Sequence, residues 1–175
     1  LSDPKKNPGG MLFQCGVHSV HELMFYFGPI KSVSAQMRYD VHTTPTADTA
    51  HCHLAFESGI IGSLNAYHVT PYRHTLSIFG TKTNLYREDT YTDEGTLLYT
   101  QTTHLDGKPE PKVPLEIDEA KSSKENTGTL ESCYQAVTEG TTPYPSLLDG
   151  ARAVHAVFAA EESARTGQPV AIPAL

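Results

Sequence analysis

The feature of this sequence that most constrains its fold is the spacing of its apolar residues, which changes from helical to alternating near residue 30. Residues 11–27 carry apolar side chains at helical spacing and are followed by Gly28-Pro29, a pair that ends helices. Because the apolar positions cover more than one side, we expect this helix to be buried between layers. Alternating, β-rich runs then follow at 33–39, 49–57, 60–69, 75–79, 84–87, 96–103 and 113–117.

Helical spacing returns in the last third of the chain. One predicted helix covers 130–140, and a longer one starts after the N-cap candidate Ser146, ends near Gly167 and precedes a short strand or tail at 170–172. The order of helix, strand block and two helices is typical of an α+β domain. Since the strands are joined by short turns, we predict a mostly antiparallel, open β-sheet with the helices packed on one face. We expect the opposite face to contact a partner subunit or domain.

Length, charge and cysteine content narrow the class of protein. A chain of 175 residues fits one domain, which we assign to residues 1–175. Its formal net charge of −7 argues against nucleic acid as a partner, and its apolar stretches are too short to cross a membrane. Three widely spaced cysteines without a C-x-x-C pair indicate free thiols in a reducing, cytoplasmic compartment. The opening polar run through Gly10 resembles a linker that follows an earlier domain.

Four short motifs occur in order along nearly the whole chain. A Gly-rich entry leads to a Gly-x-His helix core, a hairpin carries D-x-A followed by F-x-x-G-x-x-G, a strand ends in a Gly-Thr turn, and a closing helix ends in Thr-Gly. These motifs are Gly9-Gly10 with Gly16-Val17-His18, Asp48-Thr49-Ala50 with 56–62, the run 76–81, and 148–153 with 163–167. Together they resemble the C-terminal domain of the glucose–fructose oxidoreductase / inositol dehydrogenase family (Gfo/Idh/MocA).

The resemblance implies a two-domain enzyme that transfers hydride to or from a sugar, cyclitol or related hydroxy compound. An N-terminal Rossmann domain, expected upstream of residue 1, would bind NAD or NADP and carry the family's catalytic lysine. The present chain contains no G-x-G-x-x-G fingerprint, so we expect it to be inactive by itself. The sheet domain would complete the substrate pocket and form a homo-oligomer, a dimer or a tetramer, through its sheet.

The resemblance also identifies candidate catalytic residues on the first helix. Family members carry an Asp and, four residues later, a His on one face of this helix, and the corresponding positions here are Gln14 and His18. The His would take the hydroxyl proton as hydride leaves. An amide at Gln14 can orient the imidazole, but it cannot stabilise an imidazolium by charge. His21, where relatives often have Asp, is a candidate substrate-binding or structural residue.

Further candidates follow the second strand of the predicted hairpin. Tyr67, His68, Tyr72 and Arg73 lie where the resemblance places the sheet near the substrate pocket. Their hydroxyl, imidazole and guanidinium groups suit a polyhydroxylated substrate. The same residue types also suit a subunit contact, and this alternative stays open.

Two other functions remain as alternatives. Gln14 in place of the acid is consistent with a binding or assembly module that kept the fold without the redox chemistry. His18, His21 and Glu22 lie within one helical turn, and His51 and His53 share a strand face, so a His-based metal enzyme is the second alternative. We expect no metal site, because nothing in the sequence requires the helix and strand histidines to meet.

Overall fold

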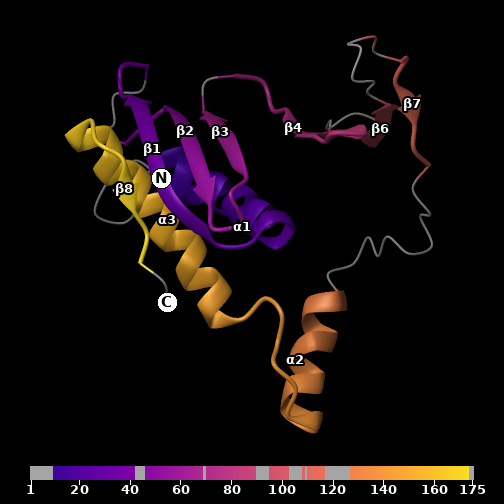
Figure 1. Cartoon of the computed structure of the whole chain (residues 1–175). Coiled ribbons are helices and arrows are strands. Elements are labelled where there is room, and N and C mark those ends of the chain that lie inside the picture. Colours follow the sequence, from indigo (N-terminus) through magenta and orange to yellow (C-terminus); the bar gives the residue numbers. More distant parts are fainter. Residues whose placement is uncertain are drawn as a thin grey trace. The chain divides into compact units, whose positions relative to one another are not determined.

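The computed structural model describes residues 10–41, 46–68, 70–89, 95–102, 108, 110–116 and 127–173. The chain divides into two compact units, one formed by Leu1–Thr70 with Ser132–Leu175 and the other by Pro71–Glu131. The first unit contains the predicted Gly-x-His helix and the closing helix (Figure 1). The predicted entry linker up to Gly9 and residues 117–126 lie outside the described residues.

The first helix follows the predicted range but begins with a π-helical turn. This turn, η1, covers Leu12–Gly16, and α1 continues over Val17–Phe27. Gly28 ends the helix with φ of +84°, and its N–H donates to the Met24 carbonyl at 2.9 Å. A left-handed φ of this kind favours glycine, which explains why the helix stops at this residue.

Four antiparallel strands form the sheet of the first unit. They are β1 (Ile30–Arg38), β2 (Thr49–Phe56), β3 (Ile61–Tyr67) and β8 (Val170–Ala171), in the spatial order β3-β2-β1-β8. β2 therefore lies between β1 and β3 (Figure 1). The C-terminal strand β8 extends the sheet beside β1, pairing Val170 with Val33.

The two faces of this sheet differ in character, as the alternation of its side chains requires. One face is packed against η1, α1 and α3, and its core residues include Val33, Ala35, Ala50, Cys52, Leu54, Phe56 and Ala66. The opposite side we call the open face, formed by Ser34, Gln36, Arg38, Thr49, His51, His53, Ser63, Asn65 and Tyr67. None of these open-face residues is buried within the described chain.

The long helix α3 (Leu147–Thr166) covers β1 and has the ends that the sequence predicts. Ser146 is the N-cap, and it forms a capping box with Asp149 in which each side chain accepts a hydrogen bond from the other residue's backbone N–H. Gly167 ends the helix in the left-handed conformation, with φ of +71°. Its small residues Ala153, Ala156 and Ala160 are buried, which lets the helix approach the sheet closely.

The second unit is a separate antiparallel sheet. It contains β4 (His74–Phe79), β5 (Thr83–Asp89), β6 (Thr96–Thr102) and β7 (Val113–Pro114) in sequential order. Helix α2 (Thr127–Glu139) follows along the chain.

The predicted α+β class with antiparallel pairing and helices is confirmed, with the difference that the strands form two sheets. Pro71 follows β3 and has no N–H to donate to a strand ladder, so a continuous hairpin from β3 to β4 is disfavoured there. Among the described residues, no helix combines the length and apolarity needed to span a membrane. The predicted strand ends at Val69, Thr103 and Ile117 fall outside the described residues.

Candidate functional site

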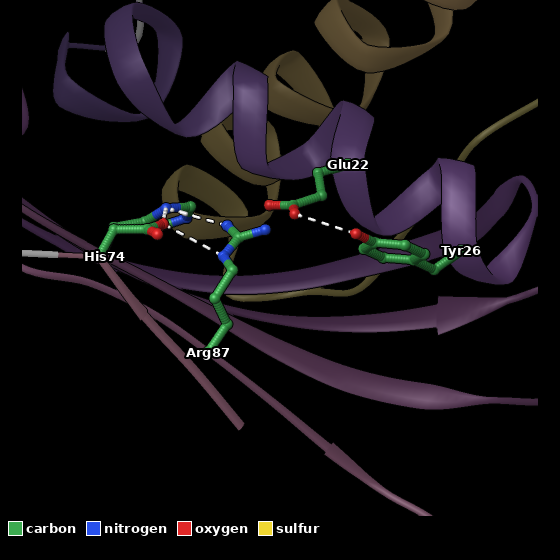
Figure 2. Close-up of polar contacts among 5 residues, drawn as sticks. Glu22, Tyr26, His74 and Arg87 are labelled. Atoms are coloured by element: carbon green, nitrogen blue, oxygen red, sulfur yellow. Dashed lines mark hydrogen bonds and ion pairs between the residues drawn. The ribbon is translucent and has the colours of Figure 1, made fainter. Parts of the chain in front are cut away.

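The first candidate group lies along one line of the helix formed by η1 and α1. Gln14, His18 and Glu22 follow each other at four-residue intervals, so their side chains share one side of the helix. His18 is exposed, whereas Gln14 and Glu22 are half-buried. Glu22 is held by its neighbour one turn later, because the Tyr26 hydroxyl donates to Glu22 Oε1 at 3.5 Å (Figure 2).

The π-helical turn that carries Gln14 packs against the core through Leu12 and Gly16. Gly16 lies between Gln14 and His18, and a Cβ on Gly16 would meet Leu12 Cδ1 at 2.7 Å. Leu12 is itself buried at 1% exposure, so the turn is anchored in the core. π-helical turns inside α-helices occur frequently at functional sites. Here the turn determines how Gln14 is presented relative to His18.

His21 belongs to an aromatic cluster within the first unit. Its ring centroid lies 5.8 Å from that of Tyr144, and the Phe25 ring lies 5.6 Å from Tyr144. Tyr144 is fixed by its backbone N–H, which donates to the Ser132 hydroxyl at 2.7 Å. Burial, with a smaller effect of the Asp149 charge, raises the pKa of Tyr144. The phenol therefore stays protonated and can donate a hydrogen bond near His21.

Asp149 provides a negative charge close to this cluster. The backbone N–H and hydroxyl of Ser146 lower the pKa of Asp149 by hydrogen bonding, and the nearby His21 and Arg152 lower it further. Asp149 is therefore ionised at neutral pH. This carboxylate places a negative charge near His21.

Tyr67 and His68, which belong to the first unit, are not gathered at this helix. Tyr67 follows the buried Ala66, so its side chain is directed to the open face, away from the side covered by α1 and α3. His68 is exposed, and its backbone N–H donates to the Asp48 carbonyl at 2.8 Å. Tyr67 and His18 thus lie on opposite sides of the first sheet.

Tyr72 and Arg73 belong to the second unit, where an ionic cluster joins β4 and β5. Arg73 Nη2 lies 2.6 Å from Glu88 Oε1, and Tyr72 is exposed. His74 Nδ1 lies 3.0 Å from Asp89 Oδ2 and 3.2 Å from Arg87 Nη2 (Figure 2). A single Nδ1 cannot both donate to the carboxylate and accept from the guanidinium, so only one of these two contacts is a hydrogen bond at a time.

The described residues contain no three-ligand site that would support the metal-enzyme alternative. No group of three or more His, Cys, Asp or Glu side chains converges among them. His18, His21 and Glu22 lie within about one turn of α1, but among the described residues they do not converge as such a group.

Comparison of the sequence with models of known families identifies one match. A family model described as the GFO/IDH/MocA C-terminal domain matches residues 1–86. These residues belong to that family. The match contains η1, α1, the first hairpin and the Gly-x-His motif. No match was found among curated proteins.

Solved structures share the fold over nearly the whole chain. An oxidoreductase candidate from Desulfitobacterium hafniense, described as NADPH-dependent, has a TM-score of 0.83 at 22% identity over 97% of this chain and 50% of its own. A levoglucosan dehydrogenase in complex with NADH has a TM-score of 0.76 at 18% identity over 95% and 51%. At these identities the likeness concerns the fold.

A third structure carries a sugar-nucleotide ligand. The WlbA dehydrogenase from Bordetella pertussis, in complex with NADH and UDP-GlcNAcA, has a TM-score of 0.68 at 18% identity over 95% of this chain and 46% of its own. The present chain spans about half the length of each of these three structures. The predicted resemblance to the GFO/IDH/MocA family is confirmed.

Two sets of residues near the candidate sites were not predicted from the sequence. Tyr144 and Asp149 come more than a hundred residues after His21, and no periodic pattern connects them to it. The pairing of His74 with Asp89 depends on the register of the β4–β5 hairpin, which places their Cα atoms opposite each other. An alternating pattern predicts the strands but not this register.

Proposed function

We propose that this chain is the substrate-side domain of an NAD(P)-dependent oxidoreductase that acts on a sugar, cyclitol or related hydroxy compound. The observation that carries the proposal is the exposed imidazole of His18, one turn after Gln14 on a family helix. An exposed, helix-anchored imidazole is suited to exchange a proton with a substrate hydroxyl.

The proposed chemistry of this chain is proton transfer and substrate orientation. When bound, the nicotinamide supplies the hydride acceptor for the C–H bond of a secondary alcohol. In that direction His18 accepts the hydroxyl proton, and in the reverse direction it returns the proton to the carbonyl oxygen. The Gln14 amide orients the imidazole by hydrogen bonding, without the charge that an Asp would contribute.

The residues that the structure describes do not fit a dinucleotide site. Dinucleotide-binding domains hold the pyrophosphate at a Gly-rich turn between a parallel strand and a helix, and the described strands pair only antiparallel. NAD or NADP would therefore be bound mainly by a Rossmann domain upstream of residue 1. The half-length coverage of the related structures supports a second domain in the whole protein.

Substrate contacts would come from the aromatic side of α1. His21, with Tyr144 beside it, offers an imidazole and a protonated phenol one turn after His18. Tyr67, His68, Tyr72 and Arg73 remain candidate substrate-binding residues, with Tyr67 on the side of the first sheet opposite α1. A cytoplasmic location also remains a proposal.

The open face supports a proposed homo-oligomer, a dimer or a tetramer. Ile61 is 83% exposed and Tyr67 is 49% exposed on this side of the sheet, so apolar area there remains available for a partner. A second copy could bury this area through a two-fold contact. Sedimentation of the full-length protein, with Ile61→Asp as the comparison, tests this proposal, and a monomeric wild type would contradict it.

The activity test uses the full-length protein with NAD+ or NADP+ and a panel of sugars and cyclitols. We expect cofactor reduction in the wild type and a loss of at least about a hundredfold in His18→Ala. Lys31→Ala, an exposed change on β1, serves as the matched control and should keep wild-type turnover. Cofactor binding without turnover, unaffected by His18→Ala, would support the assembly-module alternative that the Gln14 amide suggests.

A further inference from the structure

Two histidines stand side by side in the middle of the open face. His51 and His53 alternate along β2, so both side chains leave the same face of the strand. Their Nε2 atoms lie 3.2 Å apart, and their ring centroids lie 4.8 Å apart with the planes nearly perpendicular, at 87°. Neither ring belongs to the α1 surface described above.

Asn65 fixes the proton of one of these rings. The register places Asn65 opposite His51, and the His51 Nδ1 contacts Asn65 Oδ1 in a short hydrogen bond. Because an amide oxygen only accepts, His51 carries its proton on Nδ1 and a lone pair on Nε2. The 3.2 Å contact then has His53 Nε2–H donating to His51 Nε2.

Within the single chain, the surroundings leave the pair accessible and place no positive charge directly opposite either ring. His53 is exposed and His51 half-buried. The cross-strand neighbours of His51 are Gln36 and Asn65, and those of His53 are Ser34 and Ser63. All four neighbours are neutral and bear oxygen, so a cation approaching the two rings meets no like charge on its cross-strand neighbours.

We infer that His51 and His53 bind one divalent transition-metal ion of the Zn²⁺ or Cu²⁺ class through their Nε2 atoms. Two nitrogens 3.2 Å apart, each about 2.0–2.1 Å from an ion, subtend about 100° at it, which is close to a tetrahedral angle and also suits cis positions of a square. The existing side-chain positions therefore need little movement to chelate an ion.

Ligation needs one proton to move. His53 must present its Nε2 lone pair, so its proton transfers to its own Nδ1, and both rings remain neutral. No electron is transferred and no bond other than N–H is broken. Asn65 acts as a positioning residue, because its hydrogen bond holds His51 in the ligating tautomer.

The remaining coordination positions would be filled by water or by the same pair of a second copy. No third His, Cys, Asp or Glu converges with the pair among the described residues. The metal-to-chain ratio therefore reports the arrangement: one ion per chain for a water-completed site, and one per two chains for a shared site. Either ratio supports ligation by the pair, and it does so independently of the proposed redox function.

The test uses the full-length protein without an affinity tag, freed of metal by chelation, and titrated with Cu²⁺ alone. Calorimetry should give a saturable site, and electron paramagnetic resonance should show coupling to at least two imidazole nitrogens. His51→Ala and His53→Ala should each weaken binding at least about tenfold, and Asn65→Ala should weaken it less, by roughly tenfold or below.

The matched control is the double variant His18→Ala/His21→Ala, which removes the histidine pair of α1. Its Cu²⁺ affinity should equal that of the wild type. Circular dichroism of every variant checks that the sheet remains folded. Absence of saturable binding by the wild type would overturn the inference, as would binding that survives His51→Ala and His53→Ala or that is lost in the α1 double variant.

Discussion

The Ser163 hydroxyl of α3 accepts a hydrogen bond from the backbone N–H of Ala35 at 2.9 Å, which joins the long helix directly to β1. β8 pairs with β1 only at Ser32 and Val33, so the β1 edge beyond Val33 has no strand on that side among the residues that the structure describes. Ser163 is buried at 1% exposure, and its side chain takes the place of a strand carbonyl there. This contact positions α3, and through α3 the η1 and α1 helices that carry His18.

Ser163→Ala should therefore lower the free energy of unfolding by about 1–3 kcal/mol, because the Ala35 N–H is left buried without an acceptor. Ser58→Ala is the matched control, since Ser58 donates to the Phe27 carbonyl at 2.9 Å from an exposed position. We expect a change below about 1 kcal/mol in the control. Urea denaturation measures both values, and equal effects would contradict the role given to Ser163.

Two glycines should respond in opposite directions to alanine. Gly28 has φ of +84°, so Gly28→Ala should destabilise the protein by about 1 kcal/mol although no atom lies within 4 Å of the added Cβ. Gly150 lies within α3 and is equally uncrowded, so Gly150→Ala should stabilise it by about 0.5–1 kcal/mol. Thermal unfolding of both variants checks this, and a stabilised Gly28→Ala would contradict the helix end described above.

The capping box of α3 should give a pH-dependent contribution to stability. Hydrogen bonds from Ser146 lower the pKa of Asp149, so the contribution is present above the unfolded-state pKa of an Asp and is lost as pH falls through the lower folded-state value. Asp149→Asn should cost about 1 kcal/mol at pH 7 and much less near pH 2. Denaturation at both pH values measures the difference. An effect of equal size at both would show that the charge of Asp149 is irrelevant.

The three thiols should differ in reactivity. Burial raises the pKa of Cys52 to about 11, whereas Cys15 and Cys133 are exposed. Iodoacetamide at pH 8 should modify Cys15 and Cys133 and leave Cys52 unmodified until the protein unfolds. Peptide mass spectrometry identifies the modified sites. Rapid modification of Cys52 in the folded protein would show that the sheet core is open.

Local signals in the sequence located the elements well. The ends of α3 were predictable because Ser146 and Gly167 have specific roles at helix termini, and Gly28-Pro29 ended the first helix for a similar reason. The alternation of β2 also predicted that His51 and His53 share one face. The resemblance to a family, rather than any residue pattern, selected Gln14 and His18.

Long-range relationships were not predictable in the same way. The pairing of β8 with β1, the division into two sheets and the contact between His21 and Tyr144 depend on packing between distant segments. The open-face position of Tyr67 could be deduced only once its alternation with the buried Ala66 was known. The π-helical turn at Leu12–Gly16 was not predicted, because five residues are too few for its i→i+5 repeat to stand out in the apolar pattern.

Gln14 offers a direct test of how His18 is assisted. Gln14→Asp places a carboxylate four residues before His18, and a nearby negative charge stabilises the imidazolium formed when the base accepts a proton. We expect turnover of the full-length enzyme to rise by about tenfold, with Gln14→Asn giving no increase. Unchanged turnover in Gln14→Asp would show that this position does not act on His18.

If His18 exchanges the proton of the substrate hydroxyl, the pH dependence of kcat/KM in the full-length protein should depend on this residue. In the wild type, cofactor reduction should decline toward acidic pH, because a protonated imidazole cannot accept the proton. In His18→Ala the rate should be at least about a hundredfold lower and this acidic decline should disappear. An identical pH profile and rate in both proteins would contradict the account.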